Sequence, residues 1–400
     1  MLNPLTLRDD FRGRLEKGRL QRFRNELRAA DCAVGLYYDP INIRYATGVP
    51  NMQVYSLHNP CRYVFIAVDG PVILFDFHGC EHLSKDSTVV DEVRDARSWY
   101  HFNSGPRNHE HARLWCAEID DLMRQHGGGN SRIAIDRMDP IGTHLLEAKG
   151  YQIVEGQEVA HLARMVKSDE EVLAIRDAVN VCQYGIRQMQ LASEPGKTEQ
   201  QIWSILHQCN IEQGGEWIET RLLSSGQRTN PWYQECSARV IEAGDMISLD
   251  SDLVGPHGYS ADISRSWICG RQAPTDEQKQ LYQLAQEQLQ RNTELFKAGK
   301  SYRDIGRDAW QLPQAFQQNQ LPAISHGIGL CNEYPLVMNP QWFEASGHDG
   351  ECQAGMIFCI ESYVGAADGG EGVKLEQQIL VTDSGYELLS DMEFDADLAG

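Results

Sequence analysis

The sequence predicts an α/β domain followed by an α+β domain. The chain has 400 residues, which is more than one hydrophobic core usually serves, so two domains are expected. In residues 1–163, short apolar runs alternate with segments of helical periodicity, a pattern typical of an α/β domain. In residues 164–400, two pairs of helical segments are each followed by strand-like apolar runs, which favours an α+β domain.

The first domain is expected to begin with an amphipathic helix at residues 7–30, where leucine and phenylalanine recur near helical spacing. Two apolar runs joined by Asp69-Gly70 predict a β-hairpin over residues 62–77, because Asp-Gly favours a two-residue turn. Three consecutive glycines, residues 127–129, end a long helix. The other expected elements are strands at 33–38, 132–136 and 152–154 and helices at 108–126 and 140–149.

The helices of the second domain are marked by capping residues at their starts. Ser168 and Glu171 form a capping box, in which each side chain can bond the backbone N–H of the other residue. The apolar residues that follow recur at intervals of three and four, so they form one face of a helix. The later helices are expected at residues 198–213, at 275–297 behind a second capping box of Thr275 and Gln278, and after the cap Ser301.

Composition narrows the functional classes. The net charge of −21 argues against binding to nucleic acid or to anionic membranes and modestly favours cationic or zwitterionic ligands, although an acidic surface that aids solubility explains it equally well. No apolar run approaches the roughly 18 residues of a membrane span, and the first ten residues lack the pattern of a secretory signal. The eleven cysteines form no CxxC pair, so reduced thiols in a cytoplasmic protein are expected.

Three carboxylates, Asp250, Asp252 and Asp262, stand among apolar runs at residues 246–249 and 263–268, which predict two strands with a Gly/Pro turn between them. A hairpin places residues about ten apart side by side, so Asp252 and Asp262 can converge. A single acid near a turn is more often a solvated loop residue. Carboxylates crowded at the ends of buried strands, however, repel one another and need a compensating cation.

Three more ionisable residues, His326, Glu361 and Glu376, lie in or beside strand-like apolar runs later in the chain. An unpaired charge in such a setting is costly, so these side chains need partners. Two or three aspartates, one histidine and two glutamates together suit a pair of divalent cations bridged by carboxylates. The sequence therefore predicts a two-metal site in the second domain.

The order of these residues resembles that of the pita-bread metalloenzymes, the superfamily of methionine aminopeptidase, prolidase and creatinase. The segments that carry the resemblance are Asp262-Ile-Ser-Arg-Ser, His326-Gly-Ile-Gly-Leu and Lys374-Leu-Glu376, in the same order. The resemblance implies a creatinase/prolidase-like α/β first domain and a pita-bread α+β catalytic second domain. It also implies a metal-dependent enzyme.

Two positions differ from the peptidases of this superfamily. Trp232 follows Pro231 where the peptidases carry a histidine, and the segment after His326 is one residue shorter and lacks their second histidine. Both histidines serve amide hydrolysis, so their joint absence argues against a peptidase. The chain instead resembles the metal-dependent dimethylsulfoniopropionate (DMSP) lyases of this fold. The matching stretches are Asp-Pro-Ile-Asn-Ile-Arg-Tyr-Ala-Thr at residues 39–47, Asn-Met-Gln with His-Asn-Pro at 51–60, Gly-Glu-Trp-Ile-Glu-Thr-Arg-Leu-Leu-Ser-Ser-Gly at 215–226, and the additional Asp250.

The resemblance to the DMSP lyases runs from about residue 20 to the C-terminus. It implies a homodimer in which residues 51–60, expected as a polar loop, reach the neighbouring subunit's site, although an ordinary surface loop is nearly as good an interpretation. It implies two divalent metal ions, with iron expected and manganese, zinc or cobalt as alternatives. The implied metal ligands are Asp250, Asp252, Asp262, His326, Glu361 and Glu376.

Two other positions differ from the lyases. Asn332 stands where they have the acid taken as the catalytic base, and Leu321 stands where they have a tyrosine. An amide cannot accept the proton at neutral pH, and leucine offers no hydroxyl. Glu333 and a metal-bound hydroxide are the other candidate bases. The candidate catalytic residues are therefore Asn332, Glu333 and Trp232, and the candidate substrate contacts are Trp232 through cation–π attraction, Leu321, and Trp217, which is as readily a core residue.

The first functional hypothesis is a metal-dependent lyase that acts on a small zwitterionic carboxylate with a cationic leaving group. Cleavage of DMSP to dimethyl sulfide and acrylate is its first candidate reaction. The alternative is a metallohydrolase of the same superfamily, either similar to an Xaa-Pro peptidase or acting on a C–N bond in a small amide. A third hypothesis is a protein that binds such a ligand without turning it over.

Overall fold

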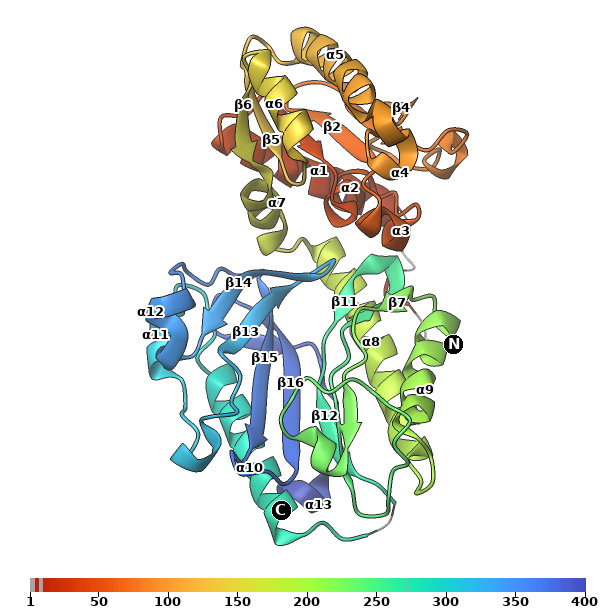
Figure 1. Cartoon of the computed structure of the whole chain (residues 1–400). Helices are drawn as coiled ribbons and strands as arrows, with labels where there is room; N and C mark the ends of the chain where they lie inside the picture. The colour runs from red at the N-terminus through yellow and green to blue at the C-terminus, as the bar shows by residue number, and fades with distance from the viewer. Residues whose placement is uncertain (1–3, 7–9, 271) are drawn as a thin grey trace. The chain divides into compact units, whose positions relative to one another are not determined.

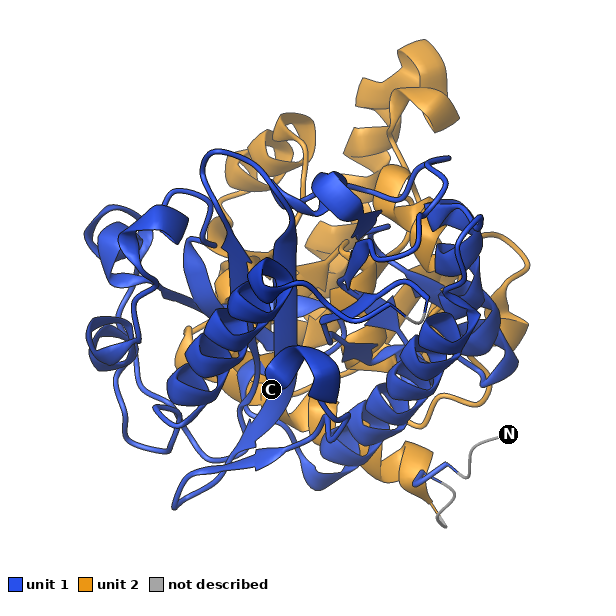
Figure 2. Cartoon of the chain, turned by 90° about the horizontal axis from the view of Figure 1, so that it is seen from below, with its two compact units in different colours: residues 1–7, 165–400 blue, residues 8–164 orange. Residues whose placement is uncertain are grey.

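The structure, a computed structural model, describes residues 4–6, 10–270 and 272–400. The chain forms two compact units, one of residues 8–164 and one of residues 165–400 together with residues 1–7 (Figure 2). This division lies one residue from the expected domain boundary. The N-terminal segment belongs to the second unit because the backbone N–H groups of Leu5 and Thr6 donate to the carboxylate of Asp177.

The first unit is built on a six-stranded sheet in the order β4-β3-β2-β1-β5-β6 (Figure 1). Strand β2 runs antiparallel to its two neighbours, and the other adjacent pairs are parallel. The strands are β1 Val34–Tyr37, β2 Tyr63–Ala67, β3 Val72–Asp76, β4 Glu92–Asp95, β5 Arg132–Ile135 and β6 Gln152–Glu155. The helices are α1 Phe11–Ala29, α2 Pro40–Thr47, α3 Gln53–His58, α4 His101–Ser104, α5 Asn108–His126, α6 Pro140–Ala148 and α7 Gly156–Met165.

Most of the elements predicted for the first unit are confirmed. The predicted hairpin is formed by β2 and β3, and α5 has the predicted bounds. Helix α1 begins at Phe11, and residues 7–9 of its predicted range lie outside the described residues. The prediction of a loop at residues 51–60 is wrong, because Gln53–His58 form α3. This stretch contains neither glycine nor proline, so nothing prevents a helical turn before Pro60.

The second unit contains three sheets, with the strand orders β11-β10-β7, β12-β9-β8 and β14-β13-β15-β16-β17. Its strands are β7 Trp217–Ile218, β8 Leu223–Ser225, β9 Met246–Leu249, β10 Leu253–Val254, β11 Ser260–Ala261, β12 Arg265–Ile268, β13 Ala323–Ile328, β14 Asn332–Met338, β15 Ile357–Gly365, β16 Gly372–Val381 and β17 Tyr386–Leu388. Its helices are α8 Asp169–Ala192, α9 Glu199–Glu212, α10 Asp276–Thr293, α11 Tyr302–Asp308, α12 Pro340–Ser346 and α13 Ala396–Ala399.

The predicted helix caps of the second unit are confirmed. The capping boxes before α8 and α10 are formed, and the side chain of Ser301 accepts the N–H of Asp304 at the start of α11. Helix α10 ends at Thr293, four residues before the predicted end, because the chain turns there and Phe296 enters the core. Within the described part of the chain, no helix has both the length and the apolar character needed to span a membrane.

Helix α10 and the hairpin of β15 and β16 form the core that positions the site. Leu281 and Leu289 of α10 share one hydrophobic cluster with Phe358 and Ile360 of β15 and Leu375 of β16. Successive residues of a strand point to opposite faces of the sheet. The residues between these apolar positions therefore face away from α10, and they include several of the predicted metal ligands.

Candidate metal centre

Two glutamates face each other across the hairpin of β15 and β16. Glu361 and Glu376 are directly paired in the register of these antiparallel strands. His326 on β13 is paired with Cys359, two residues before Glu361. Residues that are opposite each other in an antiparallel ladder, or two apart on one strand, share a face. The register therefore gathers His326, Glu361 and Glu376 on one face of the sheet.

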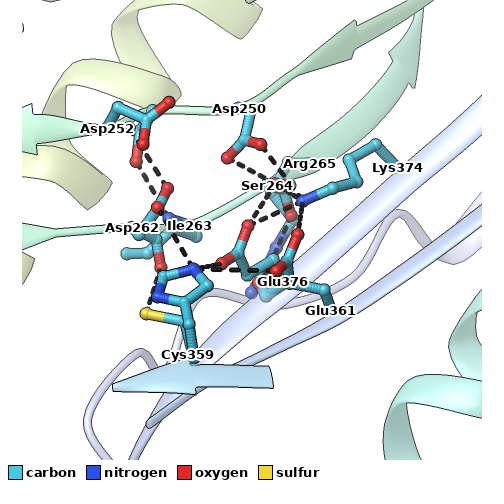
Figure 3. Close-up of polar contacts among 12 residues, drawn as sticks. Asp250, Asp252, Asp262, Ile263, Ser264, Arg265, Cys359, Glu361, Lys374 and Glu376 are labelled. Carbon is cyan, nitrogen blue, oxygen red and sulfur yellow. Dashed lines mark hydrogen bonds and ion pairs between the residues drawn. The ribbon is translucent and has the colours of Figure 1, made fainter. Parts of the chain in front are cut away.

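The aspartates come from strand ends that a hairpin brings together. Strand β10 pairs with β11, so Asp252 before β10 and Asp262 after β11 lie next to each other. The N–H of Asp252 donates to Oδ1 of Asp262 at 3.1 Å (Figure 3), which confirms their predicted convergence. Asp252 has a φ of 37°, a left-handed conformation that costs about 1 kcal/mol or more and is typical of functional sites.

The imidazole of His326 presents one nitrogen to the carboxylates. Nδ1 lies 3.0 Å from the carbonyl oxygen of Gly327, which can only accept, so Nδ1 carries a proton, and Nε2 can offer a lone pair once its own proton is lost. Nε2 is 3.6 Å from Oε1 of both Glu361 and Glu376 and 3.8 Å from Oδ2 of Asp262. These gaps are longer than a hydrogen bond and leave room for an ion that the side chains would share.

A buried lysine, for which the sequence predicted no role, lies among the carboxylates. Nζ of Lys374 is 2.8 Å from Glu376, 3.0 Å from Glu361 and 3.2 Å from Asp250 (Figure 3). Its ammonium group also lies 5.9 Å from the ring centroid of Trp232. A lysine between a valine and a leucine in an apolar strand was the sequence signal, since such a residue needs a buried partner.

Ser264 links the lysine to the acids. Its hydroxyl oxygen lies 2.9 Å from Oδ1 of Asp250 and 2.7 Å from Oε2 of Glu376, and it accepts from Lys374 at 2.9 Å. Its single proton can serve only one carboxylate at a time. The neighbouring Arg265 donates to backbone carbonyl oxygens instead, so its charge is not directed at the acids.

Burial and repulsion separate the pKa values of these carboxyl groups. Burial, with the charges of Asp252 and Glu376, raises the pKa of Asp262 well above its ordinary value. Burial also raises the pKa of Glu376, although Lys374 opposes this shift. At Asp250 the effect of burial is outweighed by Lys374 and by hydrogen bonds, so its pKa falls to about 2. Without an added cation, the cluster therefore resists full ionisation.

The side chains fit a pair of divalent cations. Five carboxylates carry −5 and Lys374 carries +1, so a neutral His326 leaves −4, which two divalent ions would balance. Oε1 of Glu376 is buried and accepts no hydrogen bond from the described residues. Three groups of side chains, each with donor atoms within 4.8 Å of one another, could hold an ion, namely Asp250, Asp252 and Asp262; Asp250, Glu361 and Glu376; and His326, Cys359 and Glu376.

The structure brings two of the predicted substrate contacts together beside this cluster. Trp232 and Leu321 pack with Tyr363 in a small buried cluster, and the rings of Trp232 and Tyr363 are 5.6 Å apart. Trp232 thus contacts the metal centre through Lys374 rather than from an open loop. Trp217 lies on β7 opposite Val254 and is half-buried.

The candidate bases lie on β14. Asn332 is its first residue, is exposed and is paired with Ile328. The carboxylate of Glu333 is buried, forms an ion pair with Lys167 at 2.9 Å and accepts the N–H of Leu330 at 3.1 Å. Glu333 therefore has the contacts of a structural residue rather than of a free base.

Tyr233 is a further residue for which the sequence predicted no role. It directly follows Trp232, is 67% exposed and has a φ of 71°. Burial of part of its side chain raises the pKa of its phenol, and the negative charge of Glu361 adds to this shift. Tyr233 lies near the carboxylate cluster because the preceding Trp232 packs beside Lys374. Only the tertiary structure reveals this proximity, because nothing in the local sequence distinguishes Tyr233 from a surface tyrosine.

Comparison with known proteins agrees with this centre. Residues 174–383 match Metallopeptidase family M24. The chain is 39% identical over 370 residues to dimethylsulfoniopropionate lyase DddP of Roseovarius nubinhibens, covering 91% of this chain and 83% of that protein. It is 24% identical over 235 residues to the Xaa-Pro dipeptidase of Pyrococcus furiosus, covering 58% of this chain and 64% of that protein.

A solved structure shows the same fold. The Xaa-Pro dipeptidase from Bacillus anthracis superimposes with a TM-score of 0.76 at 19% identity, covering 95% of this chain and 99% of that chain. At this identity the likeness shows the fold alone, which is the predicted pita-bread fold. Together with the family match and the lyase relative, it shows that the chain belongs to metallopeptidase family M24 and is a metal-dependent enzyme.

Proposed function

We propose that this enzyme is a lyase that acts on a small zwitterionic carboxylate, with DMSP as the first candidate substrate. The observation that carries the proposal is the 39% identity to a DMSP lyase over 91% of the chain. The peptidase relative matches only 58% of the chain at 24% identity. The buried Trp232, which stands where the superfamily's peptidases carry a histidine, supports the same choice.

We propose two divalent metal ions in the carboxylate cluster, with iron as the first candidate because of the resemblance to the metal-dependent DMSP lyases. Manganese, zinc and cobalt are the alternatives. When bound, the metals would supply Lewis acidity that holds the substrate carboxylate and favours loss of the neighbouring C–H proton. The proposed ligands are Asp250, Asp252, Asp262, His326, Glu361 and Glu376.

Cleavage of DMSP requires a base beside the carbon next to the carboxylate. The base removes a proton there, the C–S bond breaks, its electron pair leaves with sulfur as dimethyl sulfide, and the C=C bond of acrylate forms. Lys374 keeps Asp250 ionised and holds Glu361 and Glu376 in place. The ring of Trp232 would offer an aromatic surface to the positively charged sulfonium.

Neither candidate residue on β14 is a free base. Asn332 has no basic atom at neutral pH, and Glu333 is engaged by Lys167. We therefore propose that the wild-type chain cleaves DMSP slowly. Tyr233 is our candidate for the hydroxyl that Leu321 lacks, because it is 67% exposed and directly follows Trp232, which packs beside Lys374.

The alternative is a metallohydrolase that cleaves a C–N bond in a small amide. The exposed amide of Asn332 favours it, because this group can hydrogen-bond a substrate carbonyl without carrying charge. The deciding experiment supplies the metal-loaded chain with DMSP and, in parallel, with a panel of small amides and dipeptides. Dimethyl sulfide in the first arm supports the lyase, and a new amine in the second with no dimethyl sulfide overturns it. Saturable binding without either product supports the third hypothesis, a binding protein.

We also propose a homodimer in a reducing cytoplasmic setting. Met52, directly before α3, and Val54 and Tyr55 on α3 are 48%, 50% and 41% exposed, which is unusual for neighbouring apolar side chains. All eleven cysteines are free thiols. Light scattering coupled to size-exclusion chromatography should give twice the chain mass, and a fully active monomer would contradict the proposal.

A further inference from the structure

A pocket of about 340 Å³ opens in the first unit. Its volume lies at the lower end of the range for small-ligand sites. The metal centre does not use this pocket, since all its lining residues belong to residues 8–164. The residues that give it chemical character are Tyr38, Trp99, Tyr100, Asp136, Arg137 and Asp139.

The pocket lies at the edge of the sheet where ligands bind in α/β proteins. Because β1, β3, β4, β5 and β6 run in one direction, their carboxyl ends share an edge (Figure 1). Tyr38 directly follows β1, and Asp136 directly follows β5. The chain leaves β1 toward β2 on one side and leaves β5 toward β6 on the other. Such a reversal between adjacent strands is the usual position of a binding crevice.

Aromatic rings form the walls of the pocket. The rings of Tyr38 and Trp99 lie 6.3 Å apart at 74°, and both residues are largely buried, with exposures of 5% and 6%, so only part of each ring reaches the pocket. Tyr100 adds a third ring that is 39% exposed. Aromatic faces attract organic cations, most strongly where several rings surround the charge.

Two fixed carboxylates add negative charge to the same pocket. Asp136 accepts the N–H groups of Tyr38 and Asp39 at 2.8 and 2.9 Å. Asp139 accepts the indole N–H of Trp99 at 2.6 Å. Burial nevertheless raises the pKa of Asp136 to about 6, so a bound cation would stabilise its ionised form.

One arginine supplies a positive group to the pocket. The side chain of Arg137 is 41% exposed, and its nearest acceptors, Asp39 and Leu57, are 3.6 and 3.5 Å away. These contacts are long, so the guanidinium can turn toward a ligand carboxylate at little cost. The pocket thus offers rings and acids to a cation and one guanidinium to an anion.

We propose that this pocket is a second binding site, for a small zwitterion with a methylated ammonium or sulfonium head and a carboxylate. The head contacts the rings and acids, and the carboxylate binds Arg137. The site holds the zwitterion without cleaving it. Its existence does not depend on the proposed reaction, because it is defined by charge and aromatic surface alone.

Hydrogen–deuterium exchange of the full-length chain locates the binding. The probes are glycine betaine for the ammonium head, DMSP for the sulfonium head, tetramethylammonium for the cation alone and propionate for the anion alone. Both zwitterions should slow exchange in the segments around residues 97–101 and 136–142. Protection confined to residues 217–376 would overturn the proposal. The proposal would also be overturned if raising the protein concentration, without any probe, protected the same segments, because a second copy of the chain would then cover the pocket.

Two surface variants separate the contributions of the rings and the arginine. Tyr100→Ala should lower the affinity for glycine betaine and for tetramethylammonium alike, by about three- to fivefold, which is the size of one exposed cation–π contact. Arg137→Gln should lower the affinity for glycine betaine by about tenfold and leave the affinity for tetramethylammonium unchanged. The matched controls are Tyr386→Ala and Arg107→Gln, which remove side chains that are 36% and 65% exposed and do not line the pocket. Equal binding by all four variants would overturn the assignment.

Discussion

Two buried glutamates of the second unit, Glu199 and Glu376, lie in opposite surroundings. Both side chains are fully buried. The carboxylate of Glu199 is surrounded by donors: it accepts the N–H and hydroxyl groups of Ser225 and Ser237 and pairs with Arg228. All its hydrogen-bonding capacity is used within the fold, which is what burial of a charge normally requires.

Glu376 is only half satisfied. Its Oε2 accepts from Lys374 at 2.8 Å and lies 2.7 Å from the hydroxyl of Ser264. Its Oε1 accepts no hydrogen bond from the described residues and faces His326 at 3.6 Å. A buried acid whose oxygens are filled by donors stabilises the fold, whereas one that leaves an oxygen free among other acids is suited to a cation.

The largest effect expected from this contrast is loss of metal. Glu376→Gln and His326→Ala should lower the bound metal from the proposed two ions per chain to one or none, because each removes a proposed ligand. The same Glu→Gln change at Glu199 should leave the metal content intact and lower the melting temperature, because Arg228 loses the negative charge of its buried partner. Elemental analysis and thermal unfolding measure the two effects.

Full metal content in both Glu376→Gln and His326→Ala would contradict the assignment of the centre. If Glu199→Gln did not change the melting temperature, the hydrogen-bond donors around Glu199 would not be the difference between its surroundings and those of Glu376. Circular dichroism of each variant serves as the control for folding.

The second prediction adds an acid rather than removing one. Asn332→Asp places a carboxylate at an exposed position without internal donors, where it would be free to act as a base. If the chain is a DMSP lyase that lacks its base, dimethyl sulfide release should rise, and a general base is worth about 10²–10⁴-fold. Gas chromatography at saturating metal measures the rate. Leu321→Tyr alone should gain less, because a phenol of pKa ~10 is a poor base at neutral pH. Slower release from Asn332→Asp than from wild type would mean that the base lies elsewhere.

The third prediction tests the lysine within the cluster. Lys374→Met keeps a long side chain but removes the charge that three acids share. Outer partners of metal ligands are typically worth about 10–100-fold in metal affinity or activity, and we expect a loss of this size. The matched control is Lys300→Met, which removes a surface ion pair with Asp308. Metal titration of both variants measures the difference, and equal affinities would remove Lys374 from the centre.

The smallest predicted effect, counted per pH unit, is the dependence of metal affinity on pH. In the metal-free protein, burial disfavours the charged form of His326, but the carboxylates of Glu376 and Glu361 outweigh it and raise its pKa to about 9. Protonated His326 stabilises the folded, metal-free protein. This stabilisation is complete below the pKa of ~6.5 that histidine has in the unfolded chain, and it is lost as the pH rises through about 9. Metal must displace this proton, so apparent affinity should rise about tenfold per pH unit from 7 to 9. A flat profile in metal titrations would show that Nε2 is not a ligand.

Local signals in the sequence determined much of the fold. The capping box of Ser168 and Glu171 and the Asp69-Gly70 turn depend on residues within a few positions of one another, and both are present. The convergence of Asp252 and Asp262 was predictable for the same reason, because a short hairpin fixes which residues face each other. The two-domain α/β and pita-bread architecture followed from the order of such segments and from the resemblance.

Only the tertiary structure decided which charges meet. Lys374 forms an ion pair with the distant Asp250 because β16 lies beside β9 and β12. Glu333 forms an ion pair with Lys167, which is 166 residues away in the chain. The order of residues cannot show such pairs, since they depend on how separate strands and helices pack. For the same reason the sequence could name Glu333 as a candidate base but could not show its ion pair. Periodicity and caps act over one helical turn, whereas the partner of a buried charge is set by the whole fold.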